Sequence, residues 1–211
     1  MKIKIFLTLA VVAVVLSLSS CKASKQYVQY ISKKENIITP ETKNVIVFAT
    51  EDIRVNEFKK TFDKNFIDKR VFVNDFMTDF SKQAKLNNLF SKVSIDNKST
   101  AYSSVNLENT DYVIYFSNIE VTNRVEWRNS GGMGMNGMGG MQTTSVEYCI
   151  LNIKVEIYDA KNNKEVLDFV AIGEASVFLF NFTKTFQKAK ERAIEHIVNY
   201  LKLGKTEYTK Y

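Results

Sequence analysis

The sequence predicts an α+β fold: a mixed sheet with a long antiparallel β-meander, helices packed on the sheet, and a C-terminal amphipathic helix. Two observations predict this class. Short apolar or alternating runs, typical of strands, occur near residue 45 and again between residues 111 and 180. Segments whose apolar residues recur every three or four positions, typical of amphipathic helices, follow the first run and the last. The resulting order is strand, helix, helix, strand, three strands and helix, which is an arrangement of helices on a sheet.

The first half of the domain is predicted as a strand, two helices and a second strand. Residues 44–50 are an apolar run between polar residues, the pattern of a buried strand. Asn74 is a good N-cap for the second helix, and residues 71–73 are interpreted as a short extended link before it. Residues 89–95 are interpreted as a helix end followed by the second strand. The apolar stripes of the two helices comprise Val55, Phe58, Phe62 and Phe66, and Phe76, Met77, Phe80, Ala84 and Leu89.

The second half begins with two long strands that we expect to pair as a hairpin. Residues 111–127 start as a buried run and continue as an alternation of apolar and polar residues, so the strand is buried at its start and half exposed at its end. Residues 151–157 also alternate. Val146 and Tyr148 have the opposite phase, which predicts a β-bulge close to Cys149.

A third strand and a helix complete the predicted domain. The polar turn at residues 159–164 leads to the last strand, residues 165–180, which makes a three-stranded meander. Apolar residues then recur at helical spacing over residues 183–202, and Gly204 ends this helix.

The first twenty residues have the pattern of a secretory signal. A short basic start precedes an apolar run over residues 5–16, and small residues then lead to Cys21. The run is about a dozen residues long, whereas a membrane-spanning helix needs about 20. We therefore expect residues 1–20 to be removed.

Residues 18–21, LSSC, resemble the lipobox of bacterial lipoproteins. The resemblance implies that Cys21 receives a diacylglyceryl group, that signal peptidase II cuts before it, and that the new amino group is acylated, for example with palmitate. Several acyl chains on one residue suffice for stable anchoring in a lipid bilayer. Lys22, in place of the aspartate that inner-membrane lipoproteins commonly carry, implies the outer membrane, and the absence of an acidic cluster favours its periplasmic face. The alternative is an ordinary secretory signal that contains a cysteine.

The predicted organisation is a single periplasmic domain on a lipidated tether. An alternative for the tether is that Tyr27, Tyr30 and Ile31 pack on the domain. The predicted segments are a signal peptide over residues 1–20, the lipidated cysteine and tether over residues 21–43, the α/β domain over residues 44–203, and a polar tail over residues 204–211.

Composition and single residues argue against several classes of function. The formal net charge of +6 is dispersed along the chain, so we expect no nucleic-acid partner. Cys149 lies in an apolar stretch, where a cysteine usually acts as a small buried hydrophobe. His196, the only histidine, is expected to be solvated on the flank of its helix. No catalytic triad or phosphate-binding loop is present, so we expect no enzyme and no cofactor.

The stretch GGMGMNGMGGM, residues 131–141, occupies the tip of the predicted hairpin, residues 128–143. Three interpretations compete. The methionines form an adaptable contact surface for a protein partner or for lipid headgroups, they bind a soft metal such as Cu(I), or the tip has no role of its own. The thioethers concerned belong to Met133, Met135, Met138 and Met141.

The layout of the domain resembles the periplasmic α/β domains of CsgG-like and transport-auxiliary lipoproteins and the N-terminal domain of TolB. The resemblance is carried by a strand that begins NTDYVIYFSNIEV, a strand that ends IYDAKNNKEV, a strand FVAIGEASV and a final amphipathic helix. It implies a fold and an envelope role, and it transfers no functional residue. We therefore expect a membrane-anchored, non-enzymatic lipoprotein that binds a protein partner or forms a homo-oligomer in a transport, secretion or assembly complex. The alternative is a periplasmic small-ligand or copper-binding protein.

Overall fold

The computed structural model describes residues 24–33, 40–56, 68–99, 101–130, 142–177 and 181–209. The chain divides into two compact units. In the smaller unit, β1 (Ser24–Gln26) and β9 (Glu207–Thr209) form a two-stranded antiparallel sheet. The larger unit, Tyr27–Thr206, contains the other described elements.

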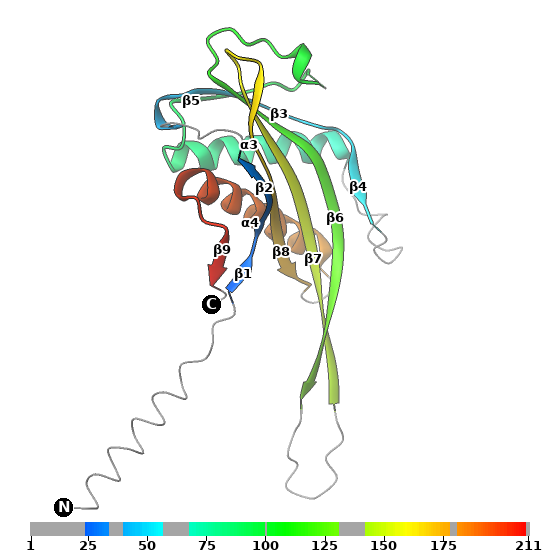
Figure 1. Ribbon diagram of the computed structural model, residues 1–211. Coiled ribbons are helices and arrows are strands. Elements are labelled where there is room, and N and C mark those ends of the chain that lie inside the picture. The colour runs from blue at the N-terminus through cyan, green and yellow to red at the C-terminus, as the bar shows by residue number, and fades with distance from the viewer. Residues whose placement is uncertain are drawn as a thin grey trace, which may run out of the picture. The chain divides into compact units, whose positions relative to one another are not determined.

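The larger unit is built on one seven-stranded sheet (Figure 1). The strand order is β2-β8-β7-β6-β3-β5, and β4 pairs with β6 beside this path. Strand β3 is parallel to β5 and β6, and β4 is parallel to β6, while the pairs β6–β7, β7–β8 and β8–β2 are antiparallel. The predicted α+β class, the mixed sheet and the β6–β7–β8 meander are confirmed. The elements of this unit are β2 (Val28–Lys33), the 3-10 helix η1 (Pro40–Thr42), β3 (Asn44–Ala49), β4 (Ile53–Val55), α3 (Lys69–Leu86), β5 (Lys92–Ile95), η2 (Tyr102–Ser104), β6 (Tyr112–Ser130), β7 (Gln142–Asp159), β8 (Lys164–Ser176) and α4 (Phe182–Leu203).

Helices α3 and α4 pack on one face of the sheet and form the main core with it. The ring of Phe116 in β6 contacts two rings of α3 edge to face, Phe76 at 4.8 Å and Phe80 at 5.3 Å between centroids. The helices also meet each other, because the rings of Phe72 and Phe186 lie 4.9 Å apart. Burying each large apolar side chain of this kind contributes roughly 1.5–3 kcal/mol to stability.

Helix α3 begins earlier than the sequence analysis predicted. Its N-cap is Asp68, whose side chain accepts a hydrogen bond from the main-chain N–H of Arg70. Phe72 and Val73, predicted as an extended link, lie in the first turns of the helix and are buried. They extend the apolar stripe by one helical turn, so the prediction of an N-cap at Asn74 is wrong.

The predicted helix between residues 55 and 66 falls mostly outside the described residues. Val55 lies in strand β4 rather than in a helix. Phe58, Phe62 and Phe66 lie outside the described part of the chain.

Helix α4 confirms the prediction for residues 183–202. Asn181 caps its N-terminus by accepting from the main-chain N–H of Lys184, and Gly204 ends it in the left-handed conformation with a φ of 65°. The helix lies very close to β8 at Gly173. A β-carbon at Gly173 would lie 2.7 Å from the main-chain nitrogen of Ala193 and still closer to the main-chain oxygen of Ala189. Only glycine therefore permits this approach of helix to sheet.

The other face of the sheet is covered at one end by residues 101–110 (Figure 1). A second, smaller core forms there around Phe48, Val105 and Val113. The ring of Tyr102 in η2 stacks on Tyr158 of β7 with 4.5 Å between centroids.

The bulge predicted near Cys149 is wrong. Both ladders of β7 run through this region without a shift, and the irregularities lie elsewhere, one between Phe116 and Asn118 of β6. The apparent change of phase has another cause. Cys149 is buried under the helices, while Tyr148 is buried on the opposite face, beneath the guanidinium of Arg124. The strand is thus buried on both faces here, and it keeps its register.

The tether predicted over residues 21–43 is wrong for the segment that forms β2. Strand β2 pairs with β8, its Val28 is fully buried, and its Ile31 packs against the main core. The alternative in which Tyr27 and Ile31 pack on the domain is therefore the better description, although Tyr30 is exposed. The strand has no regular alternation because its register against β8 shifts around Tyr30, where φ is 52°. The predicted polar tail likewise contains a strand, β9.

Candidate functional site: a two-stranded arm

Strands β6 and β7 extend beyond their neighbours as a two-stranded ribbon (Figure 1). On one side, the last residue of β6 that pairs with β4 is Val121. On the other side, the β7–β8 ladder ends at Tyr148, followed by one hydrogen bond from the Val177 nitrogen to the Glu147 oxygen. Residues 122–130 and 142–147, which we call the arm, have no further strand neighbour among the described residues.

The arm exposes two large apolar side chains on one of its faces. Val125 is 44% exposed and Trp127 is 72% exposed. Because side chains two residues apart on a strand point to the same face, Val125 and Trp127 are neighbours. Across the ladder they oppose Glu147 and Ser145, which offer them no apolar cover. The ribbon has no core of its own in which to bury these side chains.

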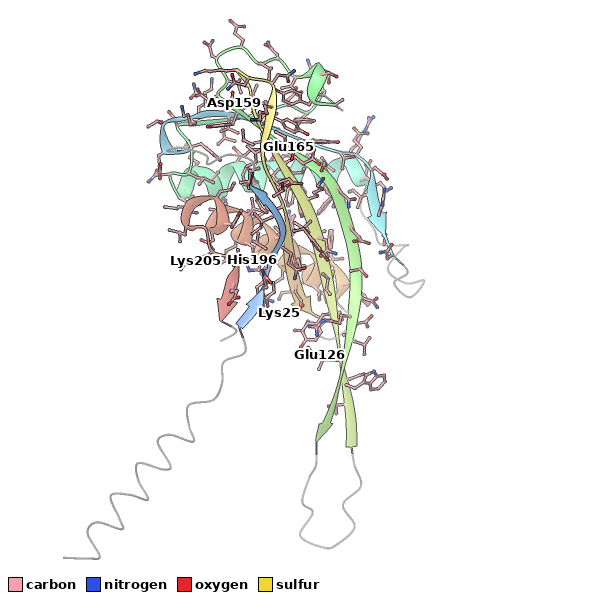
Figure 2. The ribbon with its side chains drawn as sticks, viewed as in Figure 1. Lys25, Glu126, Asp159, Glu165, His196 and Lys205 are labelled. Carbon is pink, nitrogen blue, oxygen red and sulfur yellow. The ribbon has the colours of Figure 1, made fainter. Side chains whose placement is uncertain are left out.

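The root of the arm is fixed to the sheet by a charged cluster on the opposite face. Arg124 pairs with Glu126 on its own strand and, at 2.9 Å, with Glu174 of β8. Its guanidinium also lies 4.7 Å from the centre of the Tyr148 ring, and the Tyr148 hydroxyl donates to Glu126 at 3.0 Å. Burial opposes the charge of Arg124, but its hydrogen bonds and ion pairs outweigh burial and raise its pKa. Figure 2 shows Glu126 where the arm leaves the sheet.

Next to this cluster, two side chains of α4 contact the main chain of β8. Arg192 of α4 donates to the main-chain oxygen of Glu174. His196 lies with Nδ1 2.6 Å from the main-chain oxygen of Ile172, and its ring stacks on Tyr27 at 4.5 Å. Because a carbonyl can only accept, Nδ1 carries the proton.

His196 is buried, so the prediction of a solvated histidine is wrong. Only 5% of the residue is exposed, and burial lowers its pKa to about 4. Tyr27 and the strand that follows it cover a helix flank that would otherwise face water. The local sequence of the helix holds no signal of that cover.

Cys149 is the buried hydrophobe that the sequence predicted. It is fully buried, and burial raises the pKa of its thiol to about 12. The thiol is therefore protonated at neutral pH, and a protonated thiol is a poor nucleophile.

Two shallow polar hollows border the turn after β5. One, of about 380 Å³, lies at the carboxyl ends of β3 and β5 beside the first turns of α3, and the other, of about 790 Å³, lies along β5. Both are lined by residues 96–99. The Asp96 carboxylate already accepts from the main-chain nitrogens of Lys98 and Ser99 and from the Ser99 hydroxyl. Partial burial alone would raise the pKa of Asp96, but these hydrogen bonds outweigh burial and lower the pKa. The carboxylate is therefore already engaged by hydrogen bonds within the turn.

The lipidation site and the methionines singled out in the sequence lie outside the described residues. The interpretations of these positions therefore stay predictions. Within the described ranges, no group of three or more His, Cys, Asp or Glu side chains is placed to hold a metal ion. Nor does any described helix combine the length and apolarity needed to cross a membrane. The residues concerned are Cys21, Met133, Met135, Met138 and Met141.

Comparisons with known proteins find solved structures that resemble this chain only partly and at low identity. No family model and no curated protein matches the chain. A dodecamer of PelC from Paraburkholderia phytofirmans is 12% identical, with a TM-score of 0.43, over 83% of this chain and 96% of that one. A proposed homolog of the neuraminyllactose-binding hemagglutinin from Helicobacter pylori is 13% identical, with a TM-score of 0.43, over 81% and 87%. A minor lipoprotein from Acinetobacter baumannii is 13% identical, with a TM-score of 0.37, over 75% and 93%. Similarity at this level assigns the chain to no family.

Proposed function

We propose that this chain is a non-enzymatic lipoprotein of the bacterial envelope that uses the arm to bind a protein partner in a transport, secretion or assembly complex. The observation that carries the proposal is the exposure of Val125 and Trp127 on a two-stranded ribbon that cannot bury them itself.

The arm has the properties of a contact surface. Tryptophan is enriched among the residues that dominate binding energies. Covering the Trp127 ring would remove roughly 150 Å² from water, which corresponds to about 4 kcal/mol before the costs of association. The cluster around Arg124 holds the root of the ribbon in place, so that little conformational freedom remains to be lost on binding at that point.

The envelope location and the lipid anchor are supported by the sequence. Residues 1–21 combine a secretory signal with the lipobox-like LSSC. Acylation of Cys21 would place the chain on a bilayer, and Lys22 favours the periplasmic face of the outer membrane through the same resemblance.

The burial of Cys149 and His196, two side chains of types that often act in catalysis, supports the proposal that the chain is not an enzyme. Cys149 is buried as a protonated thiol, and His196 is buried in contact with Tyr27 and the main chain of β8. Neither side chain is presented to a substrate.

Replacing both apolar residues of the arm with serine should abolish the complex without unfolding the chain. Val125 and Trp127 are exposed, so their loss should change stability by less than about 0.5 kcal/mol. We expect membranes extracted in mild detergent to show a complex on native gels for the wild type, and the uncomplexed chain for Val125→Ser/Trp127→Ser. Palmitate incorporation should be equal in both.

Leu86→Ser provides the matched control. Leu86 of α3 is 67% exposed, which is close to the exposure of Trp127, but it lies away from the arm. This variant should keep the complex. Loss of the complex in Leu86→Ser, or its survival in the double arm variant, would contradict the proposal, and absence of palmitate from the wild type would remove the lipid anchor.

A further inference from the structure

The outer edge of β6 on the arm carries main-chain groups that point away from β7. The Asn56 nitrogen donates to the Val121 oxygen at 2.9 Å, which places the main-chain groups of Val121 on the outer edge. The direction alternates along an antiparallel strand, so Asn123, Val125 and Trp127 have the same orientation. The main chain of β7 is consistent with this orientation of Val125. Glu147, which pairs with Val125, directs its main-chain oxygen toward Val177, on the side of β7 away from β6.

This edge is a template for another strand. A strand edge with outward main-chain N–H and C=O groups pairs readily with a second chain unless charge, proline or a bulge prevents it. From Thr122 to Trp127, the ladder between β6 and β7 has no bulge. No proline occurs on the arm, since Pro40 is the only proline of the chain.

The side chains along the edge are complementary to themselves in the antiparallel direction. If two copies pair with Val125 opposite its counterpart, Arg124 of each copy lies opposite Glu126 of the other. On the other face, the two valines meet and each Trp127 lies opposite Asn123 and diagonal to Val125 of the second copy, within reach of an aromatic ring. Moving the register by two residues in either direction places Arg124 opposite Arg124 or Glu126 opposite Glu126, which is unfavourable.

We propose that the partner of the arm is a second copy of this chain, bound edge to edge through β6 in an antiparallel pair centred on Val125. The inference rests on the proposed function, because it names the partner of the same surface. Arg124 and Glu126 keep their contacts with Glu174 and Tyr148, which lie on the inner side of the pair. Lipid anchoring of both copies on one bilayer would raise their effective concentration, so a short strand pairing suffices.

Disulfide capture tests the register directly. In the lipidated chain, Val125→Cys would place two thiols on directly opposite residues, about 5.5 Å apart between Cα atoms, a separation that a disulfide spans. With oxidised glutathione as the oxidant, we expect a disulfide-linked dimer of doubled mass. Asn123→Cys is the matched control, because it lies on the same face and edge but opposite Trp127 of the second copy, too far from its counterpart. The native Cys149 thiol is buried, so the wild-type chain gives the background level of disulfide formation.

A second variant separates strand pairing from chance collision. Val125→Pro removes the outward N–H of the edge without touching the ladder to β7. We expect it to return the chain to monomer mass in light scattering, with unchanged circular dichroism. Equal capture of Val125→Cys and Asn123→Cys, or a Val125→Pro variant that keeps the dimer mass, would overturn the inference. If the arm-dependent complex on native gels persists while no dimer is captured, the inference fails and the proposed function stands.

Discussion

Replacing Gly173 with alanine is expected to destabilise the chain by about 3 kcal/mol or more. The added β-carbon would collide with the main chain of Ala189 and Ala193 in α4. Main-chain atoms cannot rotate away as a flexible side chain can, so α4 must move off the sheet and lose part of its packing. Urea denaturation of the wild type and the variant measures the difference.

Gly204→Ala is the matched control for this prediction. The same methyl group meets nothing within 4 Å at this position, and the only cost is the φ of 65°. We expect a loss of about 1 kcal/mol from the left-handed conformation. Equal losses of stability in Gly173→Ala and Gly204→Ala would contradict the close approach of α4 to β8.

Acidification is expected to destabilise the fold through His196, by up to about 3 kcal/mol between neutral pH and pH 4. Burial lowers the pKa of His196 from 6.5 to about 4 in the folded chain. Below pH 6.5 the unfolded chain therefore binds a proton that the folded chain does not. The contribution of the neutral, buried His196 to the free energy of unfolding is therefore complete above pH 6.5 and is lost as the pH falls toward 4.

The measurement compares the free energy of unfolding of the wild type and of His196→Gln across this pH range. Carboxylates titrate in both proteins, so the difference between the two curves isolates the histidine. The difference should shrink as the pH falls, because the variant has lost the titrating group. Two parallel curves would contradict the burial of His196.

The parts of the fold that the sequence predicts are those whose pattern is local. The apolar stripe of α4 and the alternation in β6, β7 and β8 record which face of each element is buried. The same holds for the exposed end of β6, where Val125 and Trp127 continue an apolar alternation into a region with no core. Periodicity of this kind is sufficient to predict the α+β class.

The parts that the sequence does not predict depend on contacts between distant segments. Strand β2 is ordered by its pairing with β8, and its irregularity at Tyr30 hides it from any search for alternation. Tyr148 interrupts the expected phase because Arg124 and Glu126 cover it from β6. The extent of the arm belongs to the same class, since it is set by where β4 and β8 stop, and the predicted tip at residues 128–143 covers only its end.

Site-specific photocrosslinking in cells tests most directly the claim that the arm is the contact surface of this chain. A photoreactive amino acid in place of Trp127 is compared with one at Lys161, an exposed position in the turn between β7 and β8, at the other end of the ladder. We expect a discrete crosslinked species from position 127 in the membrane fraction, and none of comparable yield from position 161. A position 127 that yields only the uncrosslinked chain, or the same products as position 161, would contradict the role of the arm as the contact surface.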